Sequence, residues 1–386
     1  MAKPPWFDWL PGVLNREQVK RLQDWGCISG RGVDKPDLSS IDLHLTNAAW
    51  ELTDGSYKPM AYYERAFLKP PFARPLELVD GAFTLTPART YVFKLDEKLL
   101  GFSDDTPIWG QATAKSSVGR VDVLARLIVD GMNAYEAFSP GQVKAGDMFL
   151  EVTSLTFLVR VKPGESLSQL RLFHGPPNRS EVRGRELLNT ILPKPNPIKS
   201  DPEDCLLRVE LGPSKIGGAA FRAKNGVAAL PPIDLWEKEK TERPNPKDYW
   251  EIEKSKDTDD HKHLKLDKNA FYILRSYDLL ALTKSVAGYC RAIDETIGEM
   301  RIHYAGFVHP YFGRNRADKN IGTPLIFEVR GHDLSVNLVQ EEVMAKMTLY
   351  RMSEDATLDD KLDNPDASPY GNQELNLSKF FAPWPG

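Results

Sequence analysis

The sequence is poor in the side chains that bind transition metals. Its 386 residues include only three cysteines and seven histidines. The cysteines, Cys27, Cys205 and Cys290, lie far apart and form no C-x-x-C pair. Neither H-E-x-x-H nor H-x-E followed by P-C-x-x-C occurs, so the sequence disfavours zinc hydrolases and zinc-dependent nucleobase deaminases. Because sparse cysteines in odd number fit a reducing compartment, we expect a cytoplasmic protein without bound zinc.

Long apolar runs and an excess of basic charge are also absent. No run of 18 apolar residues occurs, and the opening MAKPPWFDWLPGVLN has no apolar signal core, so we expect neither a membrane span nor a secretory leader. Lys and Arg number 50 against 54 Asp and Glu, a net charge of −4. This balance disfavours a nucleic-acid partner but allows a local basic pocket for a small polyanion. A chain of 386 residues with 41% hydrophobic residues predicts a folded protein of two domains.

Short β runs separated by turn residues dominate the pattern. Two helices are also predicted. The first follows Asn15 as its N-cap, with Gln18 at the third helical position. The second has Ser116 or Ser117 as its N-cap, because apolar residues between 118 and 128 recur at helical spacing. The expected strands include LSSIDLHL, RTYVFKL, DMFLEV, LTFLVRV and LSQLRLF in the first half, and CLLRVEL, AFYILRS, MRIHYAGFV, PLIFEV and AKMTLYRM in the second.

The two halves of the chain resemble each other. Residues 91–95 parallel 272–276, and residues 149–152 parallel 326–329, each about 180 residues further on. So constant a spacing predicts a tandem duplication, and hence a mainly β protein of two similar antiparallel domains with few short helices. The expected parts are a first domain at 1–175, a Pro-rich linker at 176–204, a second copy at 205–353 and a C-terminal arm at 354–386.

Two features of the first copy could carry chemistry. Residues 115–120, KSSVGR, place two cations and two hydroxyls at a predicted helix start, which favours a phosphate site; a capped helix with solvated charges is the alternative. Glu151 lies among apolar strand residues, so it is either a buried acid–base group with a raised pKa or an outward-facing strand residue. The second copy keeps the glutamate as Glu328 but has DETIGE at 294–299, whose acids would repel a triphosphate.

These motifs resemble the dCTP deaminase branch of the dUTPase-like superfamily, and in particular its long, duplicated bacterial members. The resemblance covers nearly the whole chain. It is carried by GVLNREQVKRLQDWGCI, LSSIDLHL, TAKSSVGRVDVLARLIVDG, DMFLEV, KPGESLSQLRLF, MRIHYAGFVHPYFG and SPYGNQELNLSKFF. It implies two distorted, jelly-roll-like β-barrels assembled into trimers with sites at subunit interfaces. The implied reaction is zinc-free hydrolytic deamination of dCTP to dUTP, with Mg²⁺ on the triphosphate.

The resemblance also implies roles for individual residues. Glu151 would be the general acid–base, Ser116 would hold the attacking water, and Arg120 would stabilise charge developing at C4 of the base. Lys115 and Ser117 would contact phosphate or the pocket wall. The remaining implied substrate-binding residues are Gln169 in the strand SLSQLRLF, and Tyr370, Gln373 and Lys379 in a C-terminal arm that closes over the nucleotide.

Departures from the family pattern leave alternatives open. His309 replaces the Asp of the family's A-G-F-x-D-P-G-F-G segment, which makes a dUTPase activity of the second copy unexpected. His44 stands where an Arg is common, and Asp42 beside it is interpreted as structural. Two other functions remain, a catalytically inactive nucleotide sensor and a bifunctional deaminase–dUTPase. Glu328 is an alternative general base, facing KSSVGR across an interface.

Overall fold

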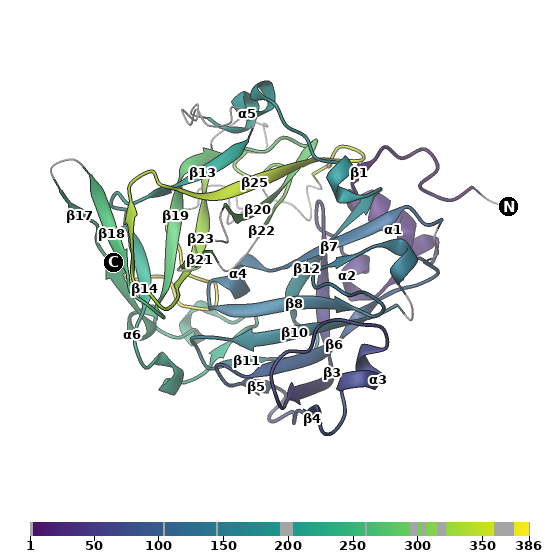
Figure 1. The fold of residues 1–386 in the computed structure, drawn as a ribbon, viewed down its shortest axis with the longest axis horizontal. Helices are drawn as coiled ribbons and strands as arrows, with labels where there is room; N and C mark the ends of the chain where they lie inside the picture. Colours follow the sequence, from purple (N-terminus) through teal and green to yellow (C-terminus); the bar gives the residue numbers. More distant parts are fainter. Residues whose placement is uncertain are drawn as a thin grey trace. The chain divides into compact units, whose positions relative to one another are not determined.

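The computed structural model describes residues 3–102, 105–143, 146–193, 204–258, 261–293, 300–302, 306–314, 322–358 and 374–385. The predictions made for DETIGE at 294–299, for Tyr370 and for Gln373 lie outside these residues. Two compact units are present (Figure 1). Unit 1 comprises residues 1–181, 228–237 and 350–357, and unit 2 comprises 182–227, 238–349 and 358–386.

Unit 1 is built mainly of strands. Its helices are α1 (Arg16–Asp24), α2 (Arg31–Asp34), α3 (Tyr63–Phe67) and α4 (Ser116–Gly119), with 3-10 turns η1 (Pro140–Gln142) and η2 (Pro177–Arg179). Its strands are β1 (Gly12–Val13), β2 (Ile28–Ser29), β3 (Ile41–Leu52), β4 (Ala73–Pro75), β5 (Phe83–Leu85), β6 (Thr90–Leu99), β7 (Ile108–Ala114), β8 (Val123–Val129), β9 (Ala137–Phe138), β10 (Asp147–Ser154), β11 (Val159–Val161), β12 (Ser166–His174) and β15 (Ile233–Asp234).

Unit 2 is also mainly β. Its helical segments are α5 (Arg185–Ile191), η4 (Lys240–Glu242) and α6 (Pro246–Tyr249). The 3-10 turn η3 (Val227–Ala229) lies where the chain passes from unit 2 to unit 1. Its strands are β13 (Cys205–Glu210), β14 (Ala220–Ala223), β16 (Trp250–Glu253), β17 (Lys256–Asp257), β18 (Lys262–Leu266), β19 (Phe271–Leu280), β20 (Val286–Ala292), β21 (Met300–Ile302), β22 (Gly306–Val308), β23 (Thr323–Gly331), β24 (Val336–Val339) and β25 (Val343–Arg351).

The order of strands repeats between the units. The main sheet of unit 1 runs β8-β10-β6-β3-β12-β7-β9. The matching order in unit 2 is β21-β23-β19-β13-β25-β20-β22, and β14 and β16 extend from the other side of β19. Glu151 lies opposite Val92 on β6, and Glu328 lies opposite Ile273 on β19. The mainly β class and the two tandem β domains agree with the sequence prediction.

Each unit also has a small three-stranded sheet, β15-β11-β5 in unit 1 and β17-β18-β24 in unit 2. Strand β15 pairs in parallel with β11 of unit 1. It comes from residues 228–237, which belong to unit 1 although the sequence assigns them to the second copy. The two compact units therefore do not coincide with the two predicted repeat copies. The predicted boundaries at 175, 204 and 353 stay predictions. Part of the predicted linker is helical, because α5 lies within it; this helix buries Leu188 and Ile191.

The first predicted helix is confirmed. Asn15 precedes α1 and accepts a hydrogen bond from the Gln18 amide at 3.0 Å, and the Gln18 side chain accepts from the Asn15 amide at 3.1 Å. This reciprocal pair is a capping box. Val19 and Leu22 are buried on the inner face, as their spacing predicts.

The second predicted helix is wrong beyond its first turn. Helix α4 ends at Gly119, its N-cap is Lys115 rather than Ser116 or Ser117, and β8 follows at Val123. Asp122 between them has a φ of 53°, a left-handed conformation that stops a helix. Strand β8 buries all of one face and also Ile128 on the other, so apolar side chains occur at helical spacings without a helix. Among the described residues, no helix is long and apolar enough to cross a membrane.

Candidate active site

Glu151 lies in β10, between β6 and β8, and its side chain points into unit 1. Only 1% of the residue is exposed, so of the two alternatives left open by strand alternation the buried one is correct. A carboxylate removed from water is stable only when donors or cations surround it. Strand β8 supplies the cation, because Arg126 lies directly opposite Glu151 in the β8–β10 register.

The two oxygens of the Glu151 carboxyl have different partners. Oε1 accepts from the Ser56 hydroxyl at 3.1 Å, from Arg126 Nε at 3.1 Å and from Arg126 Nη2. Oε2 lies 3.0 Å from the Tyr135 hydroxyl. The Arg126 guanidinium also lies over the Tyr135 ring, 4.1 Å from its centroid. Among the described residues, the charge of Glu151 is therefore balanced on Oε1, and Oε2 faces one neutral hydroxyl.

An aromatic cap covers this carboxyl from the segment between β3 and β4. Tyr57 stacks on Phe67 with 4.7 Å between ring centroids, and Tyr63, fully buried, packs against Phe149 of β10. Burial, and then the nearby Glu151 carboxylate, raise the pKa values of Tyr63 and Tyr135 above the ordinary tyrosine range. Both hydroxyls therefore stay protonated around neutral pH and act as neutral hydrogen-bonding groups.

The sequence did not single out Ser56, Tyr63, Arg126 or Tyr135. Arg126 would have been found from the strand register, since a β8–β10 pairing places it opposite Glu151. The incorrect helix prediction over residues 118–128 hid that pairing. Ser56 and Tyr135 reach Glu151 from loops, where strand spacing gives no signal.

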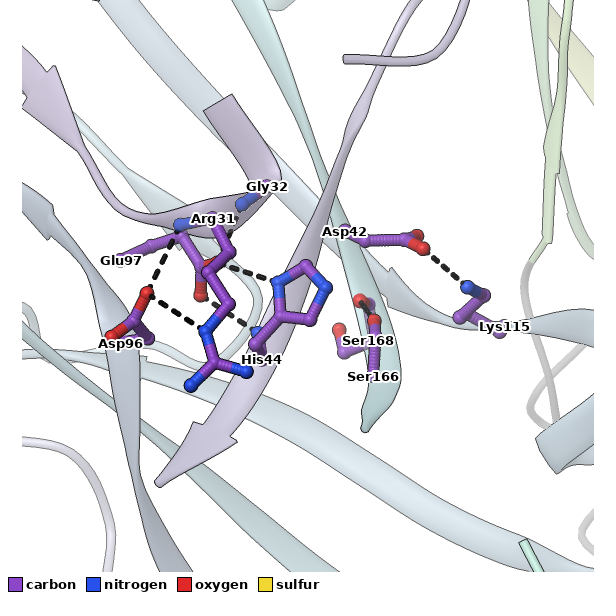
Figure 2. Close-up of polar contacts among 9 residues, drawn as sticks. All are labelled: Arg31, Gly32, Asp42, His44, Asp96, Glu97, Lys115, Ser166 and Ser168. Carbon is purple, nitrogen blue, oxygen red and sulfur yellow. Dashed lines mark hydrogen bonds and ion pairs between the residues drawn. The ribbon is translucent and has the colours of Figure 1, made fainter. Parts of the chain in front are cut away.

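The KSSVGR segment forms a second polar group on the first copy. Lys115 Nζ lies 2.5 Å from Asp42 Oδ2, and Figure 2 shows the two side chains pointing toward each other. Gln169 lies opposite Asp42 on β12 and its Oε1 accepts from the Ser40 hydroxyl at 3.1 Å. Two of the predicted phosphate-binding residues, Lys115 and Gln169, therefore lie next to Asp42.

The remaining polar residues of the motif lie in and just after α4. Ser116 and Ser117 are in the helix, Arg120 is its C-cap, and all three are half-buried. Within the described residues, the hydrogen-bond partners of the Glu151 carboxyl are Ser56, Arg126 and Tyr135. None of these three hydrogen-bond partners belongs to KSSVGR.

Near Asp42 on β3, His44 pairs with the buried Glu97 of β6. The Glu97 carboxyl, fully buried, accepts from the His44 amide at 2.7 Å and from the Gly32 amide at 3.0 Å, and its Oε1 lies 2.7 Å from His44 Nδ1 (Figure 2). In unit 2 the Arg208 guanidinium pairs with Asp278 at 2.7 Å. Both pairs join neighbouring strands, β3 to β6 and β13 to β19, so His44 serves here as the partner of a buried acid.

Glu328 and Lys379 belong to unit 2. Glu328 is buried in β23, and its charge adds to burial in raising the pKa of the Cys290 thiol to about 12. Lys379 is exposed in the segment 374–385, which packs against the rest of unit 2 through Phe381, 5.4 Å from Tyr249 between ring centroids.

Among the described residues, no group of three or more His, Cys, Asp or Glu side chains could hold a metal ion.

Comparisons with known proteins match both halves of the chain. Residues 10–176 match the family model for the N-terminal domain of 2'-deoxycytidine 5'-triphosphate deaminase, and residues 185–381 match the model for its C-terminal domain. The fold is similar to the crystal structure of 2'-deoxycytidine 5'-triphosphate deaminase from Agrobacterium tumefaciens, with a TM-score of 0.75 and 24% sequence identity. That match covers 90% of this chain and 97% of the other. A search of curated proteins finds no match.

Proposed function

The chain belongs to the 2'-deoxycytidine 5'-triphosphate deaminase family and deaminates dCTP to dUTP by hydrolysis, and we propose that Glu151 is the general acid–base of this reaction. The observation that carries the proposal is the carboxyl itself, 1% exposed and hydrogen-bonded on both oxygens in the copy that keeps KSSVGR. A carboxyl held in this way can take a proton from water and return it to the substrate, which are the two tasks of a general acid–base.

The proposed chemistry uses one carboxyl twice. Glu151 takes a proton from water as its oxygen attacks C4 of cytosine, and delivers that proton to ring N3. The hydroxyl at C4 then loses its proton through Glu151 to the amino group, the C4–N4 bond breaks, and ammonia leaves with dUTP as product. Such acid–base assistance supplies roughly 10²–10⁴-fold in rate, and positioning supplies the rest.

Ser116 and Arg120 are proposed to reach the reaction from a neighbouring copy of the chain. Within one chain the Glu151 carboxyl contacts neither of them, whereas a trimer with sites at its interfaces would bring them together. Ser116 would then hold the attacking water, and Arg120 would stabilise the charge that develops at C4. We propose a homotrimer as this assembly, as the family resemblance implies.

The triphosphate is proposed to lie on the KSSVGR side of the site. Lys115 and Ser117 would contact phosphate oxygens, with Gln169 beside them, and Mg²⁺ would enter with the triphosphate. Tyr370, Gln373 and Lys379 would close over the bound nucleotide and exclude water. The proposal also places the enzyme in the cytoplasm, where free dCTP is available, with neither zinc nor nucleic acid as a partner.

Paired substitutions test the choice of base. We expect Glu151→Gln to lower dCTP turnover by at least about 10²-fold while thermal unfolding stays close to that of the wild type. Glu328→Gln is the matched control, since the same buried strand position is changed in the second copy. An active Glu151→Gln enzyme beside an inactive Glu328→Gln enzyme would transfer the role to Glu328. Nucleotide binding without turnover by the wild-type protein would indicate a sensor.

A further inference from the structure

The Tyr135 hydroxyl has more acceptors than protons. It lies 3.0 Å from Glu151 Oε2 and 3.0 Å from the Tyr57 carbonyl oxygen. Both neighbours are acceptors, and a phenol carries one proton, so Tyr135 can donate to only one of them at a time. The arrangement therefore has two hydrogen-bonding states of similar geometry.

The division of partners at Glu151 selects the oxygen that can carry a proton. Oε1 accepts from Ser56 and twice from Arg126, which stabilises negative charge there. Oε2 has the Tyr135 hydroxyl as its one partner among the described residues, and that hydroxyl is also able to accept. Proton uptake at Oε2 leaves the Arg126 contact in place.

We propose that Tyr135 is a positioning residue for the deaminase, whose hydroxyl rotates so that Glu151 Oε2 stays hydrogen-bonded whether Glu151 is ionised or protonated. When Glu151 is ionised, Tyr135 donates to Oε2. When Oε2 carries the proton, that O–H donates to the Tyr135 oxygen, and the Tyr135 proton turns to the Tyr57 carbonyl. No proton leaves the pair in this rotation, and no bond other than hydrogen bonds changes. The inference rests on Glu151 being the acid–base.

The groups around Glu151 are consistent with a rotating neutral hydroxyl. Arg126 faces it from β8, Tyr63 from α3, Tyr135 from the loop before β9, and Ser56 from the loop after β3. Burial and the Glu151 charge both raise the pKa of Tyr135, so the phenol keeps its proton through the reaction. A buried acid that changes protonation twice per turnover would otherwise lose its hydrogen bond in one of the two states.

Tyr135→Phe tests the proposal, and Tyr63→Phe is its matched control. The Tyr63 hydroxyl also donates to the Tyr57 carbonyl, at 3.2 Å, but it does not contact Glu151. Phe at position 135 keeps the ring that lies under Arg126. We expect Tyr135→Phe to lower kcat by about ten- to a hundredfold with KM nearly unchanged, and Tyr63→Phe to change kcat less than about threefold.

The pH profile supplies a readout that a purely structural role would not move. A hydrogen bond donated to a carboxylate is stronger than one made to the neutral acid, so losing the Tyr135 hydroxyl removes a stabilising contact from the ionised form of Glu151. The acidic limb of the kcat profile should therefore move to higher pH in Tyr135→Phe and stay in place in Tyr63→Phe. Equal kcat values and equal limbs in the two variants, with Glu151→Gln inactive, would overturn the inference alone. An active Glu151→Gln enzyme would instead overturn the proposed function.

Discussion

At the residue scale, the two glutamates near Arg126 differ in their hydrogen bonds. Glu151 is hydrogen-bonded on both oxygens, whereas among the described residues the half-buried carboxyl of Glu136 has no hydrogen-bond partner. Burial raises the pKa of Glu136 to about 7, against the opposing pull of Arg126. The ordinary pKa of a glutamate is 4.5, so above that pH the unfolded chain gains free energy by ionising Glu136 while the folded protein does not. The raised pKa therefore lowers the stability of the folded protein at neutral pH.

The pH dependence of that cost can be measured with Glu136→Gln. As pH rises from about 4.5 to 7, the unfolded carboxyl loses its proton while the folded one keeps it, so wild-type stability falls across this window and stays reduced above it. Gln cannot ionise. The variant should therefore gain about 2 kcal/mol relative to wild type between pH 4.5 and pH 8, allowing for partial solvent screening. Urea unfolding at both pH values measures this, with the exposed Glu77→Gln as control; a pH-independent difference would contradict it.

At the element scale, local signals predicted what is local. The capping box at Asn15 and Gln18 involves residues three apart, and α1 was correctly predicted from them. Strand β8 depends instead on a partner far along the chain, because it pairs with β10, in which Glu151 lies opposite Arg126. Its apolar residues fit a helix equally well in sequence, and the left-handed Asp122 that breaks the helix has no strong local signature.

The α1 cap also holds a distant segment of unit 1. The Asn15 side chain accepts from the Gln18 amide and donates to the Asp355 carbonyl at 3.0 Å. We expect Asn15→Ala to destabilise the protein by about 1–2 kcal/mol, since a buried amide and a carbonyl both lose their partner. Asn15→Ser keeps the capping oxygen and should recover at least half of the loss. Denaturant midpoints measure both variants, and an unchanged midpoint in Asn15→Ala would argue against this role of the cap.

At the scale of the whole molecule, repetition in the sequence predicted repetition in the fold. The shared strand order, and Glu151 and Glu328 opposite Val92 and Ile273, follow the spacing seen in the sequence. The sequence also selected Glu151 and KSSVGR as chemical groups. It could not reveal the aromatic cap or the Arg126 and Tyr135 contacts, because these arise from register and from loops that fold back over β10. Nor could it show that β15 would join unit 1.

The most direct test of the account is product analysis of the purified full-length protein with dCTP and Mg²⁺, resolving dCTP, dUTP and dUMP by chromatography. A parallel reaction contains a zinc-specific chelator. We predict conversion of dCTP to dUTP at the same rate with and without that chelator, and no accumulation of dUMP. Accumulation of dUMP would show a second, pyrophosphatase step. Unreacted dCTP, with the nucleotide still bound to the protein, would contradict the central claim that this chain is a deaminase.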